Sequence, residues 1–281
     1  MRTHKYSLAL LLLGGALILF CPTLQAGHID TIQVSSPSMK KTVECYVVEP
    51  DKASATHPMP VLYLLHGYGG NAGTWLRIKP QLKDLADTYG MYIVCPDGKN
   101  SWYWDSPQNA EMRYETFVSK ELITGIDQRY HTIPQRTARA ITGLSMGGHG
   151  GMWISIRHKD TFGAAGSTSG GVDIRPFPKE WEMSKQLGSE VDHQRIWDEH
   201  SAINLIETLK NGDLALIIDC GYSDFFREVN EAFHQKLLKQ GIDHDYIVRP
   251  GAHTGDYWFN SIDTQLLFFS KYFQNNNTAK L

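Results

Sequence analysis

The chain has 281 residues, with 27 Lys and Arg against 30 Asp and Glu and a formal net charge of −3 at pH 7. It has no basic run and no Arg-rich segment of helical period, so nothing in the charge pattern points to a nucleic-acid partner. The length suits one domain of the larger kind.

The first 26 residues have the layout of a secretory signal peptide. Arg2 and Lys5 precede an apolar run over residues 8–20, and the segment ends in Leu-Gln-Ala at Ala26. This run is shorter than the roughly 20 apolar residues that a spanning helix needs. The bulky residue before Cys21 fits a lipid-attachment signal poorly. We therefore expect cleavage after Ala26 and export to the periplasm or the exterior, without lasting membrane insertion.

Removal of this leader leaves residues 27–281, which we expect to form a single domain. The leader takes with it two basic residues and no acids, so the formal charge becomes 25 − 30 = −5. Three cysteines remain, Cys45, Cys95 and Cys220, enough for one disulfide at most. Their spacing contains no CxxC pair and no metal-ligand cluster. We expect them to be buried free thiols.

Short apolar runs alternate with longer stretches of helical period along the mature chain. Several of the runs are apolar on consecutive residues, as in strands that are buried on both faces of a parallel sheet. The predicted strands cover residues 42–48, 61–67, 91–97, 139–145, 163–170, 214–220 and 245–251. This alternation predicts an α/β architecture with a mostly parallel central sheet and helices on both faces.

Two of the intervening stretches show helical stripes of apolar residues. The first has apolar positions between 117 and 126, and the second places Phe225, Val229, Phe233 and Leu237 on one face. The segment 173–213 breaks the alternation. It is long and rich in Pro and Trp, and we expect a lid-like insertion over the edge of the sheet.

The sequence Gly-Leu-Ser-Met-Gly-Gly begins at Gly143. A predicted strand ends at Ser145, and residues 146–157 are apolar enough to form a packed helix. This strand–Ser–helix pattern with Gly143 and Gly147 on either side is the nucleophile elbow G-x-S-x-G. A side chain two residues from the serine would clash across the turn. We expect Ser145 to be a nucleophile, with its hydroxyl projecting above the sheet.

A serine hydroxyl needs a base, and in this architecture the chain order is serine, acid, histidine. Asp224 follows a Gly-Tyr-Ser turn after a strand and opens a helix, whereas Asp219 is still inside the strand. We expect Asp224 to be the acid, with Asp219 as the alternative; either residue is also a common type of helix cap. His253 lies in a loop after the last strand, and we expect it to be the base.

Two other histidines lie beside these motifs. His66 precedes the serine, which is the wrong order, and His149 lies on the predicted elbow helix, too close in sequence to reach back. The Gly-rich loop after strand 61–65 contains Tyr68, whose backbone N–H we expect to form an oxyanion hole with that of Met146. The alternative for this loop is a plain turn.

Taken together, these residues resemble the esterase D family of α/β-hydrolases. This family includes S-formylglutathione hydrolases, tributyrin-type esterases, feruloyl and acetylxylan esterases of carbohydrate esterase family 1, and mycolyltransferases. The matching segments are 63–71, 96–106, 114–122, 143–150, 219–226 and 251–258, in the family's order over nearly the whole mature chain. The resemblance implies an α/β-hydrolase fold, Ser145, Asp224 and His253 as the triad, and no cofactor or metal. It says much less about the substrate.

The chain departs from the family pattern just after the histidine. Trp258 keeps an aromatic position, where we expect it to contact the substrate, but Gly255 stands where many relatives carry an aromatic residue. We expect Gly255 to leave room beside His253 for a bulkier group. The run Trp102-Tyr103-Trp104 follows a strand end, where ligands bind in open α/β sheets. Its rings either stack on a sugar or phenolic acid or form a structural cluster under the lid.

The sequence therefore predicts a secreted serine carboxylic ester hydrolase that acts through an acyl-enzyme. Export favours carbohydrate-linked, aryl or short-chain acyl esters, of the acetyl or feruloyl type, over a cytosolic glutathione thioester. The alternatives are a serine peptidase, an acyltransferase with the same acyl-enzyme, and a non-catalytic binding protein. The predicted partner is a small-molecule or saccharide ester, and the sequence gives no oligomeric state.

Overall fold

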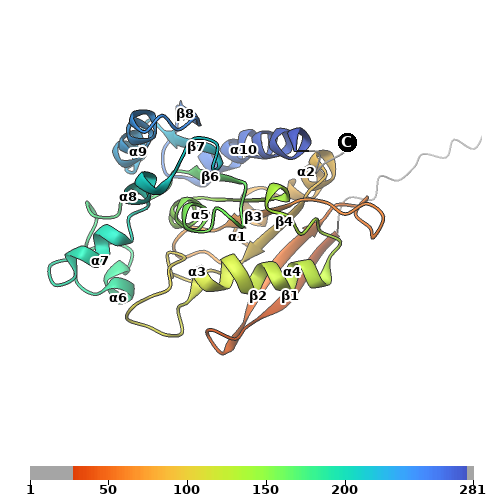
Figure 1. Ribbon diagram of the computed structural model, residues 1–281, viewed down its shortest axis with the longest axis horizontal. Helices are drawn as coiled ribbons and strands as arrows, with labels where there is room; N and C mark the ends of the chain where they lie inside the picture. The colour runs from red at the N-terminus through yellow and green to blue at the C-terminus, as the bar shows by residue number, and fades with distance from the viewer. Residues whose placement is uncertain (1–27, 277–281) are drawn as a thin grey trace, which may run out of the picture.

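The computed structural model describes residues 28–276, so the predicted leader over residues 1–26 lies outside the described residues. Eight strands form one sheet that runs through the molecule (Figure 1). The strands are β1 (His28–Ser36), β2 (Lys41–Glu49), β3 (Val61–Leu65), β4 (Tyr92–Pro96), β5 (Arg139–Gly143), β6 (Ala164–Thr168), β7 (Ala215–Gly221) and β8 (Asp245–Arg249).

The strand order is β1-β2-β4-β3-β5-β6-β7-β8. The β1–β2 and β2–β4 pairs are antiparallel, and the remaining neighbours are parallel. The prediction of a mostly parallel sheet is therefore confirmed. Strands β3, β4 and β6 are buried along their whole length, which explains their unbroken apolar or small-residue sequences.

Helices cover both faces of the sheet. They are α1 (Thr74–Ile78), α2 (Leu82–Tyr89), α3 (Tyr114–Thr116), α4 (Leu122–Arg129), α5 (Met146–Arg157), α6 (Met183–Leu187), α7 (Gln194–Glu199), α8 (Ala202–Leu205), α9 (Arg227–Lys239) and α10 (Gly255–Asn275), and a single π-helical turn over 117–121 joins α3 to α4. Helices α4, α5 and α9 pack into one core layer, and α1, α2 and α10 into the other. No helix among the described residues is long and apolar enough to cross a membrane.

The segment between β6 and β7 forms the insertion that the sequence predicts over 173–213. It contains the short helices α6, α7 and α8, and Figure 1 shows α6 and α7 projecting at one end of the molecule. The side chains of Met183, Leu187 and Trp197 are buried in it. These side chains belong to the larger core layer, so the insertion is packed onto the main core.

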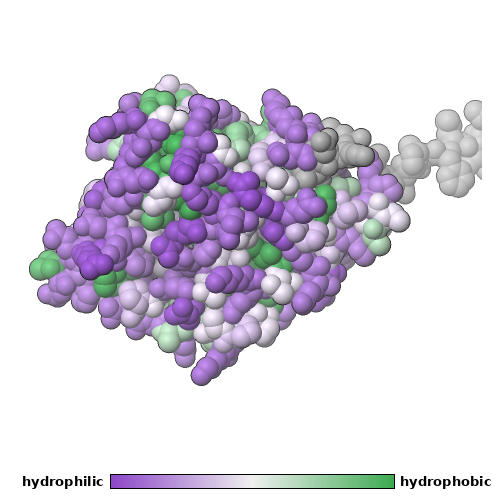
Figure 2. Space-filling model, viewed as in Figure 1, coloured by the Kyte–Doolittle hydropathy of each residue, from purple (hydrophilic) through white to green (hydrophobic). Residues whose placement is uncertain are grey.

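The predicted apolar stripe at 225–237 is wrong at its first position. Val229, Phe233 and Leu237 are buried on α9, but Phe225 precedes the helix and is 50% exposed. The reason is that the chain turns at Asp224 before the helix begins. Exposed hydrophobic side chains are otherwise scattered, and Figure 2 shows a mainly hydrophilic surface on the face drawn.

The three cysteines among the described residues are free and buried, as predicted. Cys45 on β2 belongs to one core layer and Cys95 on β4 to the other. Their side chains therefore point to opposite faces of the sheet, although the two strands are neighbours.

Candidate active site

The turn between β5 and α5 holds Ser145 in a strained backbone conformation, with φ 56° and ψ −118°. The turn fits tightly against the end of β3. A Cβ atom on Gly143 would lie 2.5 Å from the carbonyl oxygen of Leu65, and one on Gly147 would lie 2.4 Å from the same oxygen. Both distances are below any normal contact. The flanking glycines are therefore required by the space that the turn occupies.

Ser145, His253 and Asp224 lie in hydrogen-bond contact, although they are far apart in sequence. The Ser145 Oγ is 2.9 Å from His253 Nε2, and His253 Nδ1 is 3.0 and 3.1 Å from the two carboxylate oxygens of Asp224. The Asp224 side chain is fully buried and that of His253 is 14% exposed. This arrangement leaves Nε2 free to accept the serine proton when Nδ1 donates to Asp224.

The alternative acid, Asp219, lies elsewhere. Its carboxylate is fully buried and accepts hydrogen bonds from Thr168 Oγ1, Ser261 Oγ (2.7 Å) and Gln265 Nε2 (3.0 Å). These partners join the ends of β6 and β7 to α10. The structure therefore places Asp224, and not Asp219, against the histidine.

The two histidines excluded by chain order are both buried. His66 donates through Nδ1 to the carbonyl of Gly67 (2.7 Å), and its Nε2 accepts from the backbone N–H of Gly98 (2.8 Å). His149 accepts at Nε2 from the Trp104 indole (2.8 Å). Burial lowers the pKa of His149 to about 3. Neither ring is in hydrogen-bond contact with Ser145.

Residues 66–70 form a loop after β3, which we call the oxyanion loop, and it lies against the elbow. A Cβ atom on Gly67 would lie 2.5 Å from Leu144 Cδ1 and 3.2 Å from the Ser145 Cβ. Tyr68 follows directly and is only partly buried. Met146 is the first residue of α5, and the first N–H groups of a helix have no acceptor within it. The predicted oxyanion donors thus lie on two segments that meet at Ser145.

The predicted aromatic run is buried. Trp102 is 1% exposed, and Tyr103 and Trp104 are fully buried. The two indoles stack on each other with centroids 5.5 Å apart, and Trp104 packs edge-on against His149. These rings have no open face on which a sugar or phenolic acid can stack. The arrangement is that of the structural cluster, the second of the two interpretations.

Other aromatic rings surround the histidine. The Phe225 ring lies 4.2 Å from the His253 ring between centroids, and Trp258 lies edge-on at 4.9 Å. Trp181 of the insertion stacks on Phe225 at 5.5 Å with an angle of 21°. Sequence reasoning missed Phe225 and Trp181 as site residues. The sequence signal that could have identified Phe225 is its position directly after the predicted acid, Asp224.

The backbone at Trp181 is strained, with φ 47° there and φ 54° at Glu182. Such backbone conformations cost about 1–3 kcal/mol each and occur most often at functional sites.

Within residues 28–276, no group of three His, Cys, Asp or Glu side chains is arranged to hold a metal ion. Gly255 begins α10, and a Cβ atom there would meet nothing within 4 Å.

Comparisons with known proteins place the chain in an esterase family. Residues 36–269 match the Esterase family model, described as "Putative esterase". An acetyl esterase of Caldicellulosiruptor saccharolyticus is 26% identical over 232 residues, which cover 76% of this chain and 84% of that protein. An esterase of Mycobacterium tuberculosis is 25% identical over 229 residues, covering 72% of this chain and half of that longer protein.

A solved structure of a ferulic acid esterase superposes with a TM-score of 0.75 at 28% identity, over 88% of this chain and 99% of that one. The sheet with its covering helices is accordingly the α/β-hydrolase fold, as the resemblance implied. The family match spans the elbow and the segments that contain Asp224 and His253. The chain therefore belongs to this family of esterases.

Proposed function

We propose that this esterase hydrolyses carboxylic esters through a covalent acyl-enzyme on Ser145. The observation that carries the proposal is the continuous contact from Ser145 Oγ to His253 Nε2 (2.9 Å) and from His253 Nδ1 to Asp224 (3.0 Å). A base within hydrogen-bond reach of a hydroxyl, held in turn by a buried carboxylate, is the arrangement that activates a serine.

In the first half of the reaction, His253 takes the Ser145 proton while Oγ attacks the ester carbonyl. The negative charge on the carbonyl oxygen is met by the backbone N–H groups of Tyr68 and Met146. The imidazolium then gives its proton to the leaving alcohol. In the second half, His253 activates a water molecule that releases the acid and regenerates the serine. Asp224 orients the ring and stabilises its charged form.

We propose that the substrate is a carbohydrate-linked, aryl or short-chain acyl ester of the acetyl or feruloyl type. The names of two relatives, acetyl esterase and ferulic acid esterase, support both acyl types. The stacked rings of Trp181 and Phe225 beside His253 support a planar acyl group. We assign the apolar contact with the substrate to these rings and to Trp258, in place of the buried run 102–104.

The composition of residues 1–26 supports a proposed exported, periplasmic or extracellular location. A polymer-linked ester outside the cell is consistent with that location. Acyl transfer to a sugar uses the same acyl-enzyme and remains the second candidate, because the acceptor is decided only after the alcohol has left.

The test is a panel of initial rates with the mature protein and a Ser145→Ala control. The panel contains p-nitrophenyl acetate and butyrate, methyl ferulate, acetylated xylan and a peptide p-nitroanilide. We expect ester turnover that is lost in Ser145→Ala. Amide cleavage faster than ester cleavage would instead support a serine peptidase. Absence of Ser145-dependent turnover on every substrate would contradict the proposal and support a binding role.

A further inference from the structure

The hydroxyl of the fully buried Tyr103 makes two hydrogen bonds with the backbone of the oxyanion loop. The N–H of His66 donates to Tyr103 Oη (3.0 Å), and Tyr103 Oη donates to the carbonyl of His66 (3.2 Å). His66 lies two residues before Tyr68, whose N–H is a proposed oxyanion donor. A single side chain thus fixes both backbone groups at the start of this loop.

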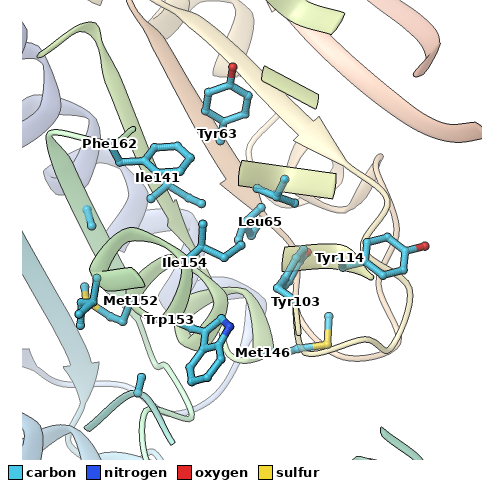
Figure 3. Packing of buried hydrophobic residues seen from close by; sticks show 14 of the residues in the cluster. Tyr63, Leu65, Tyr103, Tyr114, Ile141, Met146, Met152, Trp153, Ile154 and Phe162 are labelled. Atoms are coloured by element: carbon cyan, nitrogen blue, oxygen red, sulfur yellow. The ribbon is translucent and has the colours of Figure 1, made fainter. Parts of the chain in front are cut away.

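The Tyr103 ring is held tightly from several sides. A Cβ atom on Gly98 would lie 2.4 Å from the ring, and one on Gly150 of α5 would lie 2.5 Å from it. The residue also has a left-handed backbone, with φ 60°, and its N–H donates to Ser101 Oγ (3.0 Å). Figure 3 shows Tyr103 in the core cluster beside Met146 and Leu65. The hydroxyl therefore has little freedom to move away from the oxyanion loop.

The same segment holds the loop on the other side of Tyr68. Asn100 Oδ1 accepts a hydrogen bond from the N–H of Gly69 (2.8 Å). The N–H of Gly98 donates to His66 Nε2 (2.8 Å). His66, two residues before Tyr68, and Gly69, directly after it, are thus both hydrogen-bonded to the segment 98–103.

We propose that Tyr103 and Asn100 are positioning residues that fix the Tyr68 N–H at the oxyanion site. This inference rests on the proposed roles of Ser145 and Tyr68. An oxyanion donor acts by being in place before the charge forms, and a displacement of about 1 Å can cost roughly 10²-fold in rate. Tyr103 thus supports the chemical step through the loop and does not contact the substrate.

The test compares Tyr103→Phe with Tyr63→Phe. Tyr63 is a matched control, because it is a buried tyrosine of the same core cluster whose hydroxyl has no hydrogen-bond partner among the described residues. For p-nitrophenyl acetate, we expect Tyr103→Phe to lower kcat by about tenfold with KM within about twofold, since the lost positioning matters only when the oxyanion forms. Tyr63→Phe should leave both constants unchanged.

A second readout does not depend on knowing the substrate. A fluorophosphonate reacts when His253 takes the Ser145 proton, Oγ bonds to phosphorus and the P–F bond breaks to release fluoride. The phosphoryl oxygen then occupies the oxyanion site. We expect Tyr103→Phe to slow this labelling by the same factor as kcat. Asn100→Ala, at a partly exposed position, should show the same kcat-selective loss. This variant decides the question if Tyr103→Phe does not fold, as judged by Tm.

Several outcomes would overturn the inference. One is kcat and labelling within twofold of wild type in the folded variants. Another is a loss expressed mainly in KM, which would indicate general distortion of the site. If the wild type is labelled at Ser145 but hydrolyses no ester, the proposed function fails while the labelling rates still test the positioning. If Ser145 is not labelled at all, both proposals fail.

Discussion

Asp224 and Asp219 are two buried carboxylates that are close in sequence but have different hydrogen-bond partners. Asp224 faces the histidine, and its Oδ1 also accepts from the backbone N–H of Phe226 (2.8 Å). Asp219 has hydroxyl and amide donors around it and joins strands to α10. We therefore propose a catalytic role for Asp224 and a structural role for Asp219.

We expect Asp224→Asn to lower kcat by about 10⁴-fold, because an amide holds the imidazole in the wrong tautomer. Asp219→Asn, the matched control, should change kcat by less than tenfold and act mainly on Tm. Kinetics and thermal melts of both variants test this. A larger loss of kcat in Asp219→Asn than in Asp224→Asn would reverse the assignment.

Phe225 is half-exposed; its ring is stacked on Trp181 and tilted by 37° against the ring of His253, and we expect it to contact a planar acyl group. We expect Phe225→Ala to lower kcat/KM for methyl cinnamate by about tenfold and that for methyl butyrate by less than threefold, since a ring contact contributes about 0.5–1.5 kcal/mol beyond burial. The control is Tyr222→Ala, at an exposed tyrosine of the same loop that lies against Arg227. Equal losses for the two esters in Phe225→Ala would contradict the prediction.

The elbow consists of β5, the turn and α5, and backbone hydrogen bonds offset the strain at Ser145. The N–H of Ser145 donates to Thr168 on β6 (3.0 Å), and that of Gly147 donates to Leu144 (2.7 Å). The turn is therefore held from the neighbouring strand as well as from within.

We expect Gly147→Ala to destabilise the protein by about 2–4 kcal/mol or to prevent folding, because the new Cβ meets backbone that cannot move aside. The control is Gly255→Ala, where a Cβ meets nothing within 4 Å. This substitution should leave the free energy of unfolding within about 1 kcal/mol of wild type. Urea unfolding curves measure both. A Gly147→Ala protein as stable as wild type would show that the turn can relax.

The open space at Gly255 gives a further prediction for the start of α10. We expect Gly255→Phe to fold and to lower kcat/KM for a bulky ester more than for a small one. The reason is that an aromatic ring would fill the room beside His253 that we expect to receive a bulky group. The measurement is the ratio of kcat/KM for p-nitrophenyl acetate and a bulky aryl ester. An unchanged ratio would mean that this space does not receive the substrate.

The elements with a clear local signal were predictable from sequence. Seven strands were found because they carry consecutive apolar or small residues. Strand β1 was missed because it is an antiparallel edge strand with only Ile32 and Val34 among its buried hydrophobic residues. The short helices of the insertion span less than two turns, too little for a periodic pattern. Helix α10 does carry buried residues at helical spacing, which is the pattern that indicates an amphipathic helix.

At the scale of the whole molecule, burial of His149 couples stability to pH. The unfolded chain takes up a proton near pH 6.5, whereas burial lowers the pKa of the folded His149 to about 3. Between these values the unfolded state binds more protons, so the free energy of unfolding falls as the pH falls.

We expect this free energy to drop by about 3 kcal/mol between pH 7 and pH 4 through His149 alone. His149→Gln, which keeps an acceptor for the Trp104 indole, should flatten that part of the profile. His57→Gln, at an exposed histidine, is the control. Urea unfolding at several pH values gives the slopes. The same slope in wild type and His149→Gln would contradict the prediction.

Some features of the candidate site could not be predicted from sequence, because they depend on tertiary packing. The elbow glycines and the chain order of Ser145, Asp224 and His253 are predictable, because these residues lie in turns at strand ends that have recognisable sequence patterns. Whether Trp102 and Trp104 face solvent depends on the insertion and α5 packing over them. For the same reason, the proximity of Trp181 to Phe225, across more than 40 residues, was not visible.

The reactivity of the three buried thiols reports which parts of the folded protein unfold locally. Burial raises the pKa of all three, that of Cys95 to about 12, and only a thiolate reacts rapidly with alkylating or disulfide reagents. In the native state these three thiols should therefore be inert to such reagents. Cys45 and Cys95 lie on opposite faces of the sheet, and Cys220 lies four residues before Asp224. A time course of modification at each thiol would thus show whether the two layers separate together, or whether the segment around the acid opens first.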